Sequence, residues 1–196
     1  MSIGYRRKLL LSMGALAMAL AMPVHAMDVG GVKIDDTAVV AGKTLQLNGA
    51  SMRQILFIKI YAIGLYVEKK SSSAADILAA NTAKRISLYI QREVNSDEFG
   101  QLFITSMNKN STKEEKAKVV GQTSKFGEMF ADMGNVKKGD LITLDWVPGK
   151  GTITSVNGKQ IGEVLPDIAF NQSVMRIWLG EHPPQANIKP ALLGEK

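Results

Sequence analysis

Apolar and polar residues alternate along the first third of the chain in the way that β-strands require. Residues 29–34, 43–47 and 52–67 follow a period of two, and Asn48-Gly49 between them is typical of a hairpin turn. The longest run, which includes LFIKIYAIGLYVEK, is apolar on both faces and predicts a strand covered on both sides. A regular strand would place Lys59 and Tyr61 on the same face, beneath whatever layer covers it.

The middle of the chain changes from strand to helix. Residues 74–80 suggest a short helix, and residues 84–94 (KRISLYIQREV) alternate as a strand with one apolar face. Ser96 can cap the next helix, and Ser111-Thr112-Lys113-Glu114 reads as a capping box that opens a longer one. The first of these helices carries a mostly apolar stripe formed by Phe99, Leu102, Phe103 and Ser106.

The C-terminal third returns to strands before a final helix. Two consecutive hairpins are expected over residues 141–164, the second of them with a two-residue Asn157-Gly158 turn. The helix after Pro166 ends at Gly180. Strands at both ends of the chain with a helical block between them predict an α+β domain built on an antiparallel β-sheet.

The first 26 residues have the organisation of a secretory signal peptide. Three basic residues at 6–8 precede an apolar run over about 9–21, and Val24-His25-Ala26 is a small-x-small cleavage signal. We therefore expect cleavage after Ala26, a periplasmic protein, and one domain over residues 27–196. The apolar run is shorter than the roughly 20 residues of a spanning helix, so no stable membrane span is expected after cleavage.

Composition restricts the chemistry of the mature chain. Loss of the three basic residues lowers the formal net charge from +6 to +3, which is too small to indicate nucleic acid binding. The chain has no Cys, and of its two His only His182 remains, which excludes disulfides, thiol catalysis and multi-histidine metal sites. His182 follows the end of the last predicted helix, where capping is its expected role. No cofactor or metal is indicated.

Five stretches, in order, resemble the chalcone isomerase-like family in its bacterial exported form. They are NGASMR (48–53), KIYAIGLYVE (59–68), KKGDLITLDWVPGKGT (137–152), VNGKQIG (156–162) and IWLGEHPP (177–184). The resemblance implies an open-faced β-sandwich, in which an antiparallel sheet carries helices packed on one face and a ligand cleft lies between the layers. It also implies three activity classes: plant enzymes that cyclise chalcones to flavanones, plastid relatives that bind fatty acids, and members without established catalysis.

The resemblance identifies the candidate cleft residues. Arg53 matches the Arg of a Gly-Ala-Gly-x-Arg-like motif in the enzymes, and Tyr61 stands where the enzymes have Thr and the fatty-acid-binding relatives have Tyr. Ile177, followed by Trp178, replaces a substrate-contacting Thr, and Gln122 is the nearest polar candidate for a helical Tyr and Asn of the enzymes. The chain thus keeps the Arg and loses most of the polar groups that orient a chalcone.

The retained pair fits a carboxylate. A guanidinium offers a planar fork of donors, a Tyr hydroxyl adds another donor, and apolar walls can hold an alkyl tail. In one straight strand, however, Arg53 and Tyr61 would lie roughly 26 Å apart. A turn or bulge near residues 54–56 is therefore required, although no Gly or Pro marks one.

Three functions are compatible with these residues. The first is a periplasmic, non-catalytic protein that binds a small amphipathic acid, such as a fatty acid, through Arg53, Tyr61 and Lys59, with Ile177 and Trp178 on the cleft wall. The second is an isomerase, an intramolecular lyase acting on a phenolic or enone compound, in which Arg53 would stabilise the developing charge. The third is a structural or partner-binding envelope protein whose cleft is plugged by its own bulky side chains.

Overall fold

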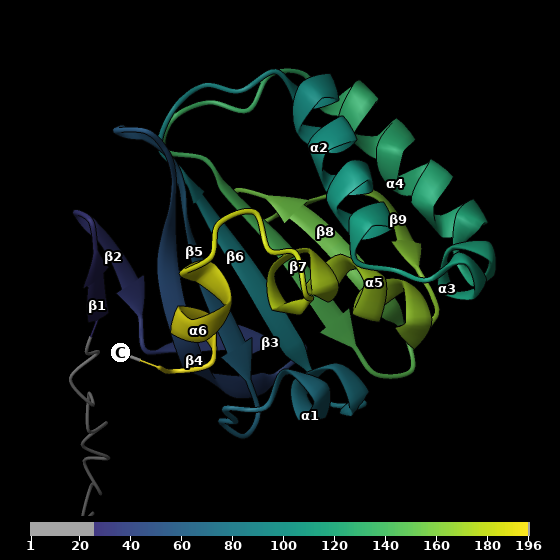
Figure 1. The fold of residues 1–196 in the computed structure, drawn as a ribbon, viewed down its shortest axis with the longest axis horizontal. Coiled ribbons are helices and arrows are strands. Elements are labelled where there is room, and N and C mark those ends of the chain that lie inside the picture. The colour runs from purple at the N-terminus through teal and green to yellow at the C-terminus, as the bar shows by residue number, and fades with distance from the viewer. Residues whose placement is uncertain (1–25, 196) are drawn as a thin grey trace, which may run out of the picture.

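A computed structural model describes residues 26–195, so the predicted signal peptide lies outside the described residues except for Ala26. The described chain is built on a seven-stranded antiparallel sheet whose strands neighbour one another in sequence order (Figure 1). The strands are β3 (Thr37–Val40), β4 (Lys43–Ile55), β5 (Ile58–Val67), β6 (Lys84–Ile90), β7 (Leu141–Val147), β8 (Gly151–Val156) and β9 (Lys159–Leu165).

Helices cover one face of this sheet, which confirms the predicted α+β class (Figure 1). They are α1 (Ala74–Ala79), α2 (Ser96–Lys109), α3 (Lys113–Lys118), α4 (Val120–Met133), α5 (Ile168–Leu179) and α6 (Ile188–Leu192). The main core lies between the two layers, where apolar side chains of β5, β6 and β7 meet the apolar faces of α2, α4 and α5. Among the described residues, no helix has the length and hydropathy needed to cross a bilayer.

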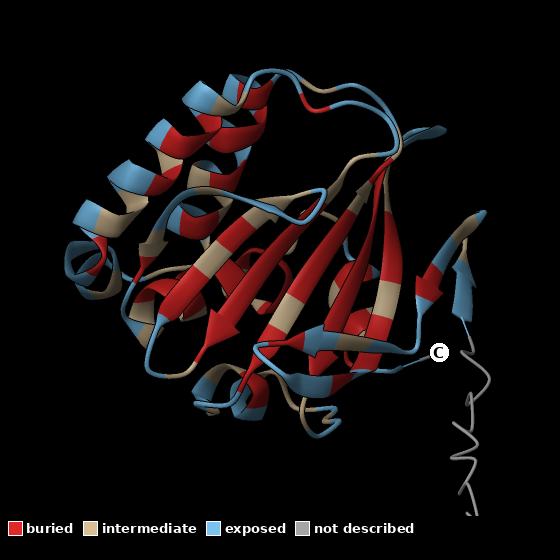
Figure 2. Ribbon diagram, turned by 180° about the vertical axis from the view of Figure 1, so that it is seen from behind, coloured by how far each residue is buried: buried red, intermediate tan, exposed pale blue. Residues whose placement is uncertain are grey.

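A smaller core lies on the opposite face of the sheet, which Figure 2 shows from behind. There a separate hairpin of β1 (Ala26–Val29) and β2 (Val32–Asp35) packs Ile34 against apolar residues of β4 and β5. The expectation of one strand over residues 29–34 is wrong, because Gly30 and Gly31 take φ angles of 62° and 88° and form the turn of this hairpin.

The predicted turn at Asn48-Gly49 is also wrong, since both residues lie inside β4 at a bulge. Asn48 uses its amide to hold two other segments: its Nδ2 donates to the carbonyl oxygens of Ser71 (2.9 Å) and Leu192 (2.7 Å). A Cβ at Gly49 would lie 2.0 Å from the carbonyl oxygen of Ala191. Asn48 and Gly49 therefore contact α6 in place of forming a turn, and these tertiary contacts override their turn propensity.

The real turn lies eight residues later, within the run predicted as one strand over 52–67. Ile55 pairs with Ile58, so Leu56 and Phe57 form a two-residue loop between β4 and β5. Leu56 takes a φ of 55°, a conformation that turns usually assign to Gly or Asn. The sequence gives no signal for this turn, because two bulky apolar residues occupy it.

The helical block starts at caps displaced by one residue from the predicted ones. Asn95, not Ser96, caps α2, and its Oδ1 accepts from the backbone N–H of Glu98 at 3.1 Å. The capping box is formed by Thr112 and Glu115, and the helix that it opens is the short α3, followed after a break by α4. The single longer helix expected here is therefore two helices.

The predicted Asn157-Gly158 turn and the end of the last helix are confirmed, whereas the capping role expected of His182 is not observed. Asn157 and Gly158 make the two-residue turn between β8 and β9 with φ angles of 51° and 80°, and α5 ends at its C-cap Gly180. His182 contacts the end of α2 through its backbone: its N–H donates to Oδ1 of Asn110 (2.8 Å), and its carbonyl accepts from Nδ2 of the same residue (3.1 Å). The backbone of His182, and not an imidazole cap, ties the C-terminal segment to the helical layer.

Candidate ligand-binding site

The β4–β5 hairpin brings the two main candidate residues together. Arg53 and Tyr61 are partners in the register of the two strands. Residues that face each other across an antiparallel pair have Cβ atoms about 4.5–5.5 Å apart, in place of the roughly 26 Å of a straight strand. The turn that the site required is therefore present, at Leu56 and Phe57.

A bulge in β5 decides which side chains share a face. Arg53 pairs with Tyr61, but the next residue, Gln54, pairs with Lys59, so Ile60 is an extra residue on β5. Ile60 and Tyr61 both pack toward the helical layer. Lys59 lies on the other face, where its Nζ donates to the carbonyl oxygen of Gly30 at 2.7 Å. The expectation that Lys59 and Tyr61 lie on one face is wrong, because it assumed an unbroken period of two.

A cavity of about 90 Å³ lies between this hairpin and the helices. Its walls are mainly apolar, and the polar side chains that reach it are those of Arg53, Tyr61 and Ser106. The lining residues are Arg53, Ile55, Ile60, Tyr61, Val94, Phe99, Leu102, Phe103, Ser106, Ile177 and Pro184. All four residues of the stripe predicted on α2 are among them, so the stripe marks the cavity wall as well as the core.

Tyr61 is buried, and its hydroxyl accepts a hydrogen bond from the indole Nε1 of buried Trp178 at 3.0 Å. Because the indole N–H can only donate, the hydroxyl proton of Tyr61 stays available for another acceptor. Within residues 26–195 the structure shows no acceptor for that proton. Burial raises the pKa of Tyr61, while the hydrogen bond from Trp178 and the charge of Arg53 lower it to a smaller extent. Tyr61 is therefore a protonated donor at neutral pH.

Arg53 is held at the cavity edge by the segment that follows α5. Its Nη1 donates to the carbonyl oxygen of Pro184, and the neighbouring backbone N–H of Gln54 donates to Oε1 of Gln185 at 2.9 Å. In the described part of the chain no carboxylate lies within ion-pair distance of Arg53. Its positive charge and its remaining N–H donors are thus available to an anion in the cavity.

Of the other candidate residues, one lines the cavity and one supports Tyr61. Ile177 lines the cavity, so an apolar side chain stands at the position of the enzymes' Thr. Trp178 lies behind Tyr61 and acts through the hydroxyl that it holds. Gln122, on α4, is not part of the cavity wall. Pattern reasoning missed Ile60, which only the bulge exposes to the cavity, and Pro184, which contributes a backbone carbonyl.

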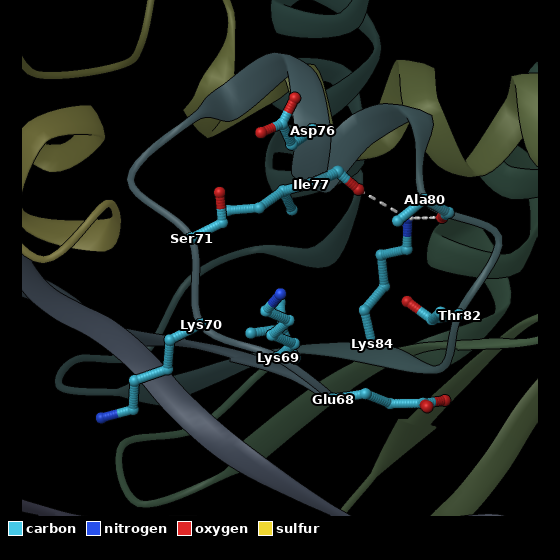
Figure 3. A pocket seen from close by; sticks show the side chains of 10 residues that line it. Glu68, Lys69, Lys70, Ser71, Asp76, Ile77, Ala80, Thr82 and Lys84 are labelled. Atoms are coloured by element: carbon cyan, nitrogen blue, oxygen red, sulfur yellow. Dashed lines mark hydrogen bonds between the residues drawn. The ribbon is translucent and has the colours of Figure 1, made fainter.

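A larger hollow of about 640 Å³ opens beside α1 (Figure 3). The buried Lys84 borders it, and the amine donates to the carbonyl oxygens of Ile77 (2.8 Å) and Ala80 (2.6 Å), at the end of α1. Two of its three N–H donors are therefore used in capping that helix. The described residues include no cluster of His, Asp or Glu that could hold a metal ion.

Comparison with known proteins agrees with this fold. The model of the family described as chalcone isomerase-like matches residues 26–194. The chain belongs to the chalcone isomerase-like family. Among solved structures it is similar to a fatty-acid binding protein of Arabidopsis thaliana, with a TM-score of 0.60 and 17% sequence identity over 80% of this chain and 95% of that chain. At this identity the likeness shows a shared fold. No significant match is found among curated protein sequences.

Proposed function

We propose that this member of the chalcone isomerase-like family is an exported, non-catalytic binding protein for a small amphipathic acid, with a fatty acid as the representative ligand. The observation that carries the proposal is the cross-strand pair of Arg53 and Tyr61 at the edge of an apolar cavity. The fold shared with a protein described as fatty-acid binding supports it.

The pair has the donors that a carboxylate needs. Arg53 supplies a charge-assisted hydrogen bond, and Tyr61 supplies a neutral one, because its pKa is raised and its proton is not otherwise used. The bond from Trp178 polarises the same hydroxyl and makes it a better donor. Both groups are fixed before a ligand arrives, which reduces the entropy lost on binding.

The alkyl chain requires more room than the cavity now has. A volume of about 90 Å³ is well below the roughly 300–1,000 Å³ of small-molecule sites. It accommodates the acid group and the first carbons of a ligand. Because Leu102 and Phe103 of α2 form one wall, we expect α2 to move away from the sheet when a long chain binds.

A catalytic role has less support in this site. Cyclisation of a chalcone needs a phenolate held in place while an enolate develops, and fixed polar donors meet both demands. Here Ile177 presents an apolar wall to the cavity. We therefore expect chalcone isomerase activity to be no more than a weak side reaction.

The exported location rests on the order of basic, apolar and small residues before Met27. The start of the family match at residue 26 supports it, since the domain then begins where the signal peptide is expected to end.

The ligand proposal is tested by native mass spectrometry of the purified chain, followed by titration with a long-chain fatty acid. We expect co-purified or titratable fatty acid, and affinity about ten- to a hundredfold weaker in Arg53→Ala, as loss of a charge-assisted bond predicts. Arg92→Ala, which removes an exposed Arg outside the cavity, is the matched control. Unchanged affinity in Arg53→Ala contradicts the proposed site. Chalcone turnover at the level of a plant enzyme would favour the isomerase, and a chain that binds neither ligand would favour the plugged cleft.

A further inference from the structure

Large apolar side chains are exposed at the tip of the β4–β5 hairpin. Leu56 is 86% exposed and Phe57 is 97% exposed, and the flanking Ile55 and Ile58 are also exposed. The tip projects from one end of the sheet and carries the exposed colour in Figure 2. We refer to residues 55–58 as the hairpin tip. Single exposed apolar residues are common on soluble proteins, but a contiguous group marks an interaction site.

The side chains of Leu56 and Phe57 stabilise neither the core nor the turn. Phe57 has almost all of its surface in solvent, so it contributes little to folding. Leu56 has a φ of 55°, which a side chain with a Cβ adopts at a cost that Gly or Asn avoids. Gly at the first loop position would form this two-residue turn more readily, because only that position has a positive φ. The side chains at this position therefore need an explanation outside the fold.

The same end of the molecule carries a small excess of basic side chains. The backbone N–H of Gln91, in the loop after β6, donates to the carbonyl oxygen of Ile60 at the start of β5. The backbone N–H of Gly139, in the loop before β7, donates to the carbonyl oxygen of Ile90, so this loop lies next to the first one. Basic side chains next to the tip and in these loops outnumber acidic ones. The basic residues are Lys59, Arg92, Lys137 and Lys138, and the acidic residues are Glu93 and Asp140 of the two loops and Asp28 of the β1–β2 hairpin that Lys59 contacts. The carboxylate of Asp140 already accepts hydrogen bonds from the backbone N–H of Lys137 and from Asn157.

We propose that the hairpin tip inserts into the interfacial layer of an anionic lipid bilayer. Apolar and aromatic side chains that project from a basic surface fit such a layer, because the side chains enter the acyl boundary while the basic groups meet the lipid phosphates.

The shape of the tip favours a bilayer over a protein partner. An aromatic side chain buries about 150–250 Å², so this tip can bury only a few hundred Å². A stable protein interface needs roughly 800 Å² on each side and a complementary surface. A bilayer closes around a narrow projection without needing a matching pocket.

The position of the tip also suggests its purpose, and this step rests on the proposed ligand function. Ile55 belongs both to the tip and to the cavity wall, and Leu102, which is exposed on α2, lines the same cavity. Insertion of the tip would hold the mouth of the cavity against the bilayer. An amphipathic acid could then pass between lipid and cavity beside Ile55 and Leu102.

The docking proposal is tested by flotation of residues 27–196 with vesicles of phosphatidylglycerol and phosphatidylethanolamine, with no free fatty acid present. The main variant replaces Leu56→Gly and Phe57→Asn, which keeps the loop at two residues and places Gly at its position of positive φ. We expect this variant to keep its melting temperature and to bind vesicles at least about tenfold more weakly. Val39→Ser is the matched control, because Val39 is 62% exposed on β3, away from the hairpin tip. This control variant should bind vesicles like the wild type.

Two further measurements separate the outcomes. Tryptophan fluorescence of Phe57→Trp should shift to the blue on addition of anionic vesicles, while that of Val39→Trp should not, and vesicles of phosphatidylcholine alone or high salt should reduce the shift. Equal vesicle binding by the Leu56→Gly, Phe57→Asn variant and the wild type would overturn the proposal. A wild-type dimer that the same variant dissociates, with no binding to vesicles, would also overturn it and identify a second copy of the chain as the partner. Fatty-acid affinity measured without vesicles should be unchanged in the variant, so failure of docking is distinguishable from failure of ligand binding.

Discussion

The hydrogen bond from Trp178 to Tyr61 makes a strong prediction about stability. Tyr61→Phe keeps the ring in its packed position but removes the only acceptor that the structure gives to the indole N–H of Trp178 in the described chain. A buried donor left without a partner costs about 1–3 kcal/mol. For a chain of this size each kcal/mol lowers the melting temperature by roughly 2–4 °C, so the loss should be visible in a thermal scan.

A double-mutant cycle separates this hydrogen bond from changes in packing. Trp178→Phe alone leaves a cavity in the aromatic cluster around Phe103, whose ring centroid lies 5.5 Å from that of Trp178. In the variant that combines Tyr61→Phe with Trp178→Phe, neither polar group remains unpaired. We therefore expect the double variant to be more stable than the sum of the two single effects, by about 1–2 kcal/mol.

Urea unfolding followed by far-ultraviolet circular dichroism is the suitable assay, because it does not depend on the fluorescence of the substituted Trp178. Effects of the two substitutions that add within about 0.5 kcal/mol would refute the hydrogen bond as a stabilising contact. The same result would weaken the argument that Tyr61 is held in place as a carboxylate donor.

Three further predictions concern other parts of the chain. Gly49→Ala should destabilise the fold by at least about 2 kcal/mol in urea unfolding, because the new Cβ would meet the backbone of α6, whereas Gly121→Ala on α4, with open space around its Cβ position and no positive φ, should cost nothing. Burial lowers the pKa of Lys84 from 10.5 to about 8, so above pH 8 the unfolded chain binds more protons than the folded one. Stability should therefore rise from pH 8 to about 9.5, and Lys84→Met should flatten this slope. Amino-terminal sequencing of protein recovered from the cell envelope should begin at Met27, and an uncleaved N-terminus would contradict export with cleavage.

The strands were predictable wherever one residue type dominated each face. Residues 141–147 and the Asn157-Gly158 turn follow pattern and turn chemistry directly, and the structure reproduces them. The β4–β5 region does not, because its turn has no Gly, Asn or Pro and its Asn-Gly pair is used to hold the C-terminal segment. Local turn rules fail in both directions there, since the deciding contacts are about 140 residues away in the chain, as between Asn48 and Leu192.

The site was predictable in its chemistry but not in its geometry. The resemblance supplied Arg53 and Tyr61, and the apolar stripe on α2 supplied much of the wall. The bulge at Ile60 could not be read from the sequence, because a one-residue insertion leaves the alternation of apolar residues nearly intact while it moves Lys59 to the other face. The partnership of Trp178 with Tyr61 depends on how α5 crosses the sheet, and no local pattern encodes that crossing.

The β4–β5 hairpin carries both proposed functions: its loop is the docking tip, and its strands hold the ligand site. The two-residue loop at Leu56 and Phe57 fixes the pairing of Ile55 with Ile58, and through the bulge it fixes that of Arg53 with Tyr61. Substitutions within the loop change what the tip offers to a bilayer without moving this register. The pairing of β5 with β6, which includes Tyr61 with Ile90, holds the same register from the other side. Docking should therefore be removable by substitution in the loop, with fatty-acid affinity unchanged.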